Sequence, residues 1–251
     1  MRILLVLIWV LLAAPIQSAS GADLTAEQVR GILAAADRPA DLSGKSLENL
    51  DLSKLDFRRA NLSGANLFGA KLDGADLTGA NLSGAKLDLA WIMRANFTNA
   101  DLSNASLLGL VVSSGLENNL AEAPIFKGAK FAGAHIIARL SRFDLSGADF
   151  TGAKMAPDLR NQSMGLMRTD LSGANLSGAN LSKADLGLAL MRFTNLTGAS
   201  LRGANLSSAD LSGANLTDAD LTGADATDAD FGRAVMNGAR GLETVKRLTR
   251  Q

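Results

Sequence analysis

A period of five residues dominates this sequence and limits the folds open to it. An apolar side chain stands at every fifth residue from Leu42 to Leu107, an unbroken run of 14 positions. A second run covers 15 positions from Leu166 to Met236, with Ala226 as its one weak member. Five matches neither the 3.6-residue period of a helix nor the two-residue period of a strand. The chain is therefore expected to turn a corner every five residues, with the apolar side chains inside.

The residues between the apolar positions support this interpretation. Ala predominates two residues before each of them, and Asn or Asp, Ser or Thr, and Gly fill the other places. These types form turns, through tolerance of positive φ and hydrogen bonds from side chain to backbone. The chain has 25 Gly, no Tyr and two Trp, so a core of large interlocking aromatics is not what organises it.

The repeated motif resembles that of a known family. Ala-Asn-Leu-Ser-Gly, as at Ala60–Gly64, Ala80–Gly84 and Ala174–Gly178, is similar to the pentapeptide-repeat motif, and variants of it recur about thirty times. The resemblance implies an all-β solenoid, a right-handed quadrilateral β-helix with four pentapeptides per coil. About nine coils, spaced by roughly 4.8 Å, would make a rod on the order of 43 Å long.

Residues 1–22 have the layout of a secretory signal peptide. Arg2 precedes the apolar run Ile3–Ala14, and small residues follow Pro15. The run is about 12 residues long, short of the roughly 20 that span a bilayer. Cleavage is expected after Ser20 or Ala22, which places the mature protein in the periplasm or outside the cell, with no stable membrane insertion. The alternative is an uncleaved N-terminal anchor.

The remaining chain divides into five parts. Residues 23–39 are expected to form a short capping helix, with Thr25 as N-cap, Gln28 completing a capping box and Pro39 ending the helix. A solenoid end needs such a cover, although this helix could instead bind a partner. Two repeat blocks cover 40–112 and 166–241. Interrupted repeats with loops cover 113–165, and residues 242–251 form a C-terminal tail or cap.

The five-residue pattern breaks at 113–124 and again at 157–165. Between the breaks it runs out of phase, first at Phe126 and then from Leu145. The breaks are either surface loops that the repeat tolerates or a projecting recognition surface.

Two similar apolar segments are the candidate partner-binding site. Trp91 and Leu190 replace the usual outward Asn or Asp, and Leu89 and Leu188 replace the usual Gly. Exposed Trp with Leu, Met and Arg is typical of interface hot spots. The alternative is that a loop from one of the breaks covers Trp91. The candidate residues are Leu89, Trp91, Met93, Arg94, Leu188, Leu190 and Arg192.

The sequence offers little for catalysis, and we expect no catalytic, metal-binding or cofactor-binding residues. There is no Cys, the single His is His135, and no phosphate-binding loop is present. The carboxylates between Asp210 and Asp230 could act as acid and base or hold Ca²⁺. The repeat itself places them outward, which is the simpler explanation.

The favoured function is an exported, non-catalytic scaffold that binds another protein, as a monomer or homodimer. Lys plus Arg balance Asp plus Glu at 25 each, so net charge gives no reason to expect nucleic acid or a membrane surface. The family resemblance implies one alternative, a DNA mimic that protects topoisomerases, which the export signal and zero net charge oppose. A polysaccharide-acting β-helix enzyme is the other alternative, supported only by the acidic stretch.

Overall fold

The computed structural model describes residues 21–35, 39–115, 118–159 and 167–245. The expected signal peptide lies outside these residues, apart from its last two. In the part of the chain that is described, no helix is long and apolar enough to cross a membrane.

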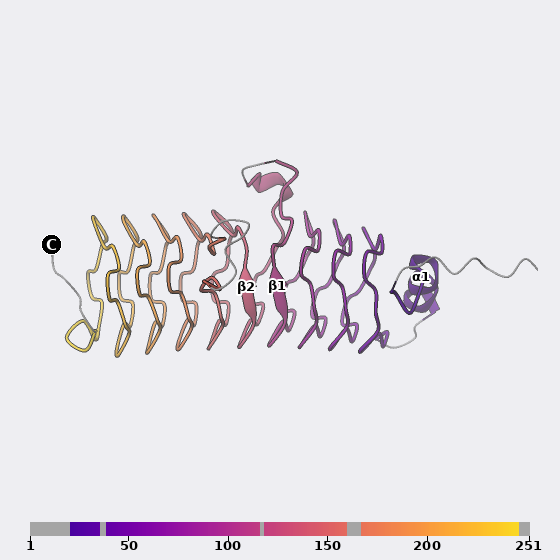
Figure 1. The fold of residues 1–251 in the computed structure, drawn as a ribbon, viewed down its shortest axis with the longest axis horizontal. Coiled ribbons are helices and arrows are strands. Elements are labelled where there is room, and N and C mark those ends of the chain that lie inside the picture. The colour runs from indigo at the N-terminus through magenta and orange to yellow at the C-terminus, as the bar shows by residue number, and fades with distance from the viewer. Residues whose placement is uncertain (1–20, 36–38, 116–117, 160–166, 246–251) are drawn as a thin grey trace, which may run out of the picture.

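The chain winds into a stack of coils joined by parallel bridges (Figure 1). In the regular parts each bridge links a residue to the one 20 positions later, as Asp41 to Asn61, and each turn has four bridge positions. The N–H of Leu62 donates to the carbonyl of Asn81 in the next coil at 2.7 Å. The N–H of Asn81 donates back to Ala60 at 2.9 Å. Neighbouring coils thus satisfy each other's backbone groups.

Regular secondary structure is sparse. The described chain contains helix α1 (Ala26–Ala35), the 3-10 turn η1 (Leu120–Glu122) and the parallel strands β1 (Ser106–Leu108) and β2 (His135–Ile137). All other described coils pair through isolated bridges. The parallel pairing agrees with the expectation of an all-β chain, and the named strands are short because a turn in every pentapeptide leaves few extended residues.

The apolar ladder points inward, as its period predicts. Every member from Leu42 to Leu107 is at most 2% exposed, and the Ala companions from Ala60 to Ala105 are also buried. Phe231 and Met236 in the last coil are only half-buried, because the described chain adds no further coil beyond them.

Helix α1 lies at the N-terminal end of the stack (Figure 1). The predicted capping box is confirmed: the Thr25 N–H donates to Gln28 Oε1 at 2.7 Å, and the Gln28 N–H donates to Thr25 Oγ1 at 3.2 Å. Val29 is fully buried in the core. The Asp23 N–H donates to the Ser46 carbonyl, and the Ser46 N–H donates to Asp23 Oδ2, both at 2.8 Å. The helix is thus attached to the first coil.

Each corner uses the turn chemistry that the motif predicts. The outward Asn or Asp accepts the N–H two residues later, as Asn81 accepts that of Ser83 at 3.0 Å. The residue after that has φ near +60° and is usually Gly. Leu89 and Leu188, which replace Gly, adopt the same conformation with φ of 58° and 61°.

At most corners, a residue that bears a side chain is followed by glycine in the next coil. The side chain reaches over that glycine, so a Cβ there would lie 2.5 Å from Phe193 Cδ1 at Gly213 and 3.6 Å from Lys54 Cγ at Gly74. Ten side chains are paired with glycine in this way, and the run Leu188, Ser208 and Asp228 is an exception, with a side chain in three successive coils. The pairs are Asn49–Gly69, Lys54–Gly74, Arg59–Gly79, Leu89–Gly109, Asn99–Gly128, Asn104–Gly133, Arg142–Gly173, Lys183–Gly203, Phe193–Gly213 and Asp218–Gly238.

We expect Gly213→Ala to destabilise the protein more than Gly84→Ala. Both changes place a Cβ at positive φ, which costs about 1 kcal/mol. Only Gly213 also meets a side chain, since nothing lies within 4 Å of a Cβ at Gly84. Urea unfolding of both variants measures the difference. Adding Phe193→Ala should bring the cost of Gly213→Ala down to that of Gly84→Ala, and an unchanged cost would contradict the steric explanation.

The two breaks leave the stacking intact. Asn96 bridges Ile125, so the turn that contains the first break, 113–124, is longer than a regular one; we call this break the first loop. Arg139 bridges Asp170, so the turn that contains the second break, 157–165, is also longer; we call this break the second loop. Lys130 bridges Asp149, 19 residues later instead of 20, so the coil between them is one residue shorter than a regular one; we call it the short coil. These changed spacings account for the shifts in phase of the sequence pattern.

Phenylalanine replaces leucine in the core where the register changes. The ring centroids of Phe97 and Phe126 lie 5.2 Å apart, those of Phe126 and Phe131 5.4 Å, and those of Phe131 and Phe150 4.8 Å. These stacked and edge-to-face rings join three coils across the first loop and the short coil.

Thr169 maintains a turn at the second loop. In a regular turn, an Ala N–H donates to the core carbonyl three residues earlier, as Ala90 to Leu87 at 3.0 Å. After Met155 the second loop begins, so the Ala that would donate its N–H to the Met155 carbonyl in a regular turn does not follow it. The single proton of the buried Thr169 hydroxyl instead has two carbonyl acceptors within reach, those of Met155 and Ile136, each 2.8 Å from Oγ1.

Candidate binding face

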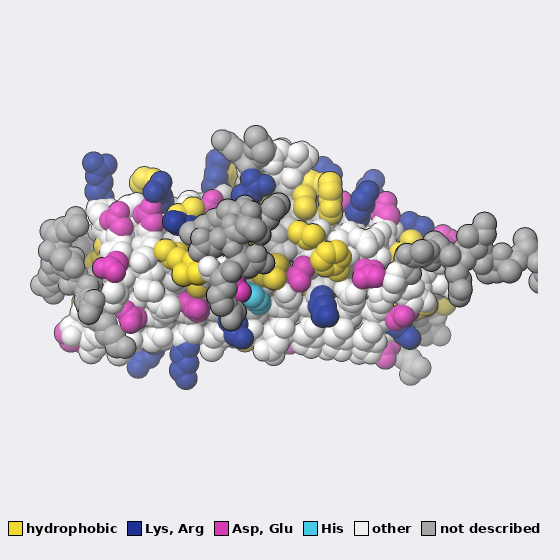
Figure 2. Space-filling model, viewed as in Figure 1, with side chains coloured by type: hydrophobic (Ala, Val, Ile, Leu, Met, Phe, Trp, Pro, Cys, Tyr) yellow, Lys and Arg dark blue, Asp and Glu magenta, His cyan; other side chains and the backbone are white. Residues whose placement is uncertain are grey.

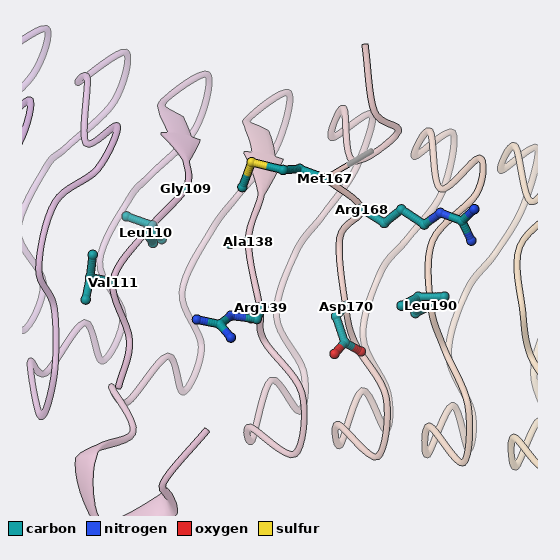
Figure 3. Close-up of a pocket in the computed structure, with 9 residues that line it drawn as sticks. All are labelled: Gly109, Leu110, Val111, Ala138, Arg139, Met167, Arg168, Asp170 and Leu190. Atoms are coloured by element: carbon teal, nitrogen blue, oxygen red, sulfur yellow. The ribbon is translucent and has the colours of Figure 1, made fainter. Parts of the chain in front are cut away.

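One of the four outward rows differs from the others. The other three rows carry Asn in at least two coils each, but this row carries none. Its bridges run from Asp51 through Trp91 to Val111, and from Arg139 through Leu190 to Asp230. Arg139 lies on the coil after Val111 (Figure 3). We call this row the candidate face: Asp51, Lys71, Trp91, Val111, Arg139, Asp170, Leu190, Asp210 and Asp230.

The candidate face brings the two predicted apolar segments together. Trp91 and Leu190 are far apart in the sequence but only four coils apart in the stack, about 19 Å at the usual strand spacing. Trp91 is 40% exposed and Leu190 is half-buried. The Lys71 Nζ lies 5.8 Å from the centre of the Trp91 ring, within range of a cation–π contact.

The other predicted residues flank this row. Leu89 and Leu188 lie at the corner on one side, and Leu89 is 49% exposed. Met93 is half-buried and Arg94 is exposed at the other corner. Arg192 donates through Nε to Asp210, so its charge is partly neutralised within the chain.

A shallow hollow of about 470 Å³ lies between the two apolar segments. Figure 3 shows Val111, Arg139, Asp170 and Leu190 on successive coils along it. Figure 2 shows two groups of hydrophobic side chains on the side of the stack that faces the viewer. Residues 116–117 and 160–166 of the breaks lie outside the described residues, so the expectation that a loop covers Trp91 stays a prediction. The lining residues are Gly109, Leu110, Val111, Ala138, Arg139, Met167, Arg168, Asp170 and Leu190.

Sequence reasoning missed several exposed apolar side chains, and Phe193 and Met167 are the two most exposed of them. Phe193 is 72% exposed and Met167 is 56% exposed. Phe193 stands where the repeat has Gly, the same substitution that singled out Leu188, and this signal could have identified it. Met167 lies just after the second break, where the repeat gives no guide to exposure.

The groups considered for catalysis take structural positions. His135 is half-buried in β2 and pairs with Ser106 and Lys154 in the neighbouring coils. Asp210 and Asp230 each accept a turn N–H, from Ser212 at 3.1 Å and Gly232 at 2.7 Å. Across the described ranges, no three His, Cys, Asp or Glu side chains are grouped so as to hold a metal ion.

Turn hydrogen bonds lower the pKa of several outward carboxylates. The Arg58 side chain and the Arg58 N–H both donate to Asp56 and lower its pKa to about 2. The Thr222 hydroxyl and N–H, with help from Arg202, lower the pKa of Asp220 to about 2. These groups favour the folded state only while they are ionised.

Stability should therefore fall as the pH drops from about 4 to about 2. A carboxylate with a lowered pKa in the folded state contributes fully above its unfolded pKa of about 3.9, and this contribution is lost as the pH falls through the folded value. Melting temperatures followed by circular dichroism between pH 2 and 7 measure the loss. Asp220→Asn keeps the turn acceptor but does not titrate, so its profile should fall less steeply. An identical acid profile for this variant would contradict the assignment to Asp220.

One known family matches both repeat blocks. The matching description is pentapeptide repeats, in eight copies, over residues 40–67, 60–109, 169–207 and 199–238, more than half of the chain. This chain belongs to the pentapeptide-repeat family. The matches stop at 109 and resume at 169, so the unmatched middle contains both loops and the short coil. A comparison with curated proteins finds no match.

Solved pentapeptide-repeat proteins, which form right-handed quadrilateral β-helices, are structural neighbours. HetL of the cyanobacterium Nostoc sp. strain PCC 7120, involved in heterocyst differentiation regulation, is 26% identical. The match covers 89% of this chain and 94% of HetL, with a TM-score of 0.41. QnrB1, a plasmid-mediated fluoroquinolone resistance protein, is 21% identical over 77% of this chain and 90% of its own, with a TM-score of 0.41. Rfr23 of the cyanobacterium Cyanothece 51142 is 22% identical over 70% and 90%, with a TM-score of 0.28.

Proposed function

We propose that this pentapeptide-repeat protein is an exported, non-catalytic scaffold that binds another protein through the candidate face. The observation that carries the proposal is the 40% exposed Trp91, which shares a face with Leu190 where the other rows carry Asn. A partly exposed Trp flanked by Leu, Met and Arg has the composition of binding hot spots. A long regular surface also suits binding better than catalysis.

The proposed scaffold is a right-handed, four-sided β-helix with α1 as its N-terminal cap. The regular spacing of the bridges, with four bridge positions per turn, supports the four-sided shape. The buried Val29 and the hydrogen bonds between Asp23 and Ser46 support the capping role, because they attach α1 to the first coil.

Export belongs to the same proposal. Arg2, the apolar run that follows it and the small residues before Ala22 support a cleaved signal peptide and a periplasmic or secreted protein. N-terminal sequencing of the accumulated protein tests this directly. A mature N-terminus at Gly21 or Asp23 would support it, and an intact Met1 in the cytoplasm would contradict it.

Photocrosslinking in the native host tests the binding face. A photoreactive residue replaces Trp91 in one variant and Leu190 in another. The controls are Asn81 and Asn180, exposed bridge residues on the opposite row of the same two coils. We expect one discrete adduct from both Trp91 and Leu190, and none from the controls.

Other outcomes would redirect the proposal. Equal adducts from Asn81 and Trp91 would show nonspecific contact and would contradict a specific face. No adduct from Trp91 or Leu190, in a protein whose circular dichroism is unchanged, would contradict binding at this face.

A further inference from the structure

One corner of the stack carries a row of basic side chains. The corner lies three residues after each member of the candidate face along the chain. It bears a side chain in every second coil, so neighbouring side chains of the row are about 9.6 Å apart at the usual spacing of coils. Every one of these residues is exposed. We call this row the basic edge: Lys54, Arg94, Arg142, Phe193 and Arg233.

The composition of the basic edge does not follow from the repeat. At the other three corners, the non-glycine residues with positive φ include only two cations, Arg59 and Lys183. The rest are Asn49, Leu89, Asn99, Asn104, Leu188, Ser208, Asp218 and Asp228. Any side chain at such a corner costs about 1 kcal/mol relative to Gly. Four cations out of five on one edge are therefore a bias that corner geometry does not explain.

The four cations of the basic edge are free of ion pairs with the described residues. Arg58, Arg192 and Arg202 each have an Asp partner within 4 Å, but Lys54, Arg94, Arg142 and Arg233 have none in the described chain. The Arg142 stem lies along the edge, with Cγ 3.4 Å from where a Cβ at Gly173 would stand. The stem therefore packs on the backbone while the charged end remains in solvent.

Exposed apolar side chains lie on the same edge. Phe193 is 72% exposed within the row. The first loop leaves from this edge, where the Arg94 N–H donates to the Glu122 carbonyl at 2.7 Å, and it carries Leu120, which is 52% exposed. Figure 1 shows the loop projecting from the stack, and Figure 2 shows Lys, Arg and hydrophobic side chains along that upper edge.

We infer that the basic edge binds the surface of an anionic lipid bilayer. Its residues lie along one edge, about 38 Å for eight coil spacings, and the first loop with Leu120 projects from that edge next to Arg94. Basic groups at this edge would lie among anionic headgroups, and Phe193 and Leu120 would enter the interface between headgroups and acyl chains.

The zero net charge of the chain gives no sign of this edge, and two acids, Asp73 and Glu122, lie close enough to Arg94 for its charge to favour their ionised forms. The basic edge borders the candidate face and shares Arg94 with the predicted partner-binding residues, but the inference rests on the row of cations and not on Trp91 or Leu190.

Vesicle co-sedimentation of the purified full chain tests the inference. The probes are vesicles of phosphatidylglycerol and phosphatidylethanolamine, compared with vesicles of phosphatidylcholine. The edge variant is Arg94→Glu with Arg142→Glu. The control variant is Arg59→Glu with Lys183→Glu, which reverses two cations of the same backbone conformation at other corners. All proteins share one N-terminus, so any binding by the apolar run that follows Arg2 is common to them.

We expect binding to the anionic vesicles that weakens with added salt. The edge variant should lose about tenfold in partitioning or more, since each cation near an anionic surface contributes a severalfold factor. The control should lose less than threefold, and Phe193→Ser should lower binding without changing its salt dependence. Equal losses in the edge and control variants would overturn the inference. So would binding to a soluble anionic polysaccharide in the absence of any binding to anionic vesicles.

Discussion

Leu77→Asp is expected to unfold the protein. Leu77 is fully buried, and its core neighbours in the two adjacent coils are Phe57 and Phe97. The new carboxylate would have no partner in this apolar interior, which costs more than about 4 kcal/mol. Because each coil pairs with both neighbours, loss of one coil also removes the template for the next. Circular dichroism and urea unfolding of the purified variant measure the effect.

Two further variants make the result specific to the core. Asn81→Asp adds the same charge in the next pentapeptide at an exposed outward position, and should change stability by less than about 0.5 kcal/mol. Leu77→Ala should leave a folded protein that is about 2–5 kcal/mol less stable. A Leu77→Asp variant that folds with unchanged stability would mean that the side chain does not point inward.

Phe131→Ala is expected to cost about 3–5 kcal/mol, the second largest effect. The Phe131 ring lies 4.8 Å from that of Phe150 and 5.4 Å from that of Phe126, between centroids. These rings fill the core where one coil is a residue short and the first loop leaves the stack, so the cavity would open where the coil register is least regular. Urea unfolding measures the loss.

Phe231→Ala is the matched control for this change. Phe231 occupies the inward position of a pentapeptide in the last coil, on the opposite side of the stack, and is only half-buried, so its loss should be clearly smaller. Phe131→Leu, which restores the usual residue of the repeat, should recover part of the stability. A cost for Phe131→Ala equal to that of Phe231→Ala would mean that the stacked rings do not hold the irregular coils together.

Much of the local structure could be predicted from the sequence, because each pentapeptide carries its own turn chemistry. The period of five predicted which side chains are buried, and burial from Leu42 to Leu107 confirms it. The motif predicted membership of the pentapeptide-repeat family, which the family comparison confirms. Thr25 and Gln28 predicted a capping box, which their mutual hydrogen bonds confirm. All of these depend on residues within a few positions of one another.

Which residues share a face was decided only by the tertiary structure. The two loops lengthen the spacing between paired coils and the short coil reduces it, so the row of a residue beyond the breaks cannot be counted from the repeat alone. The observed bridges place Trp91 and Leu190 on one face and Arg94, Arg142 and Arg233 on one edge. The sequence by itself determined the local turn and the inward side of every pentapeptide, because these follow from short-range sterics and hydrogen bonds. The surfaces depend on how the coils stack across the loops, and only the folded chain establishes that.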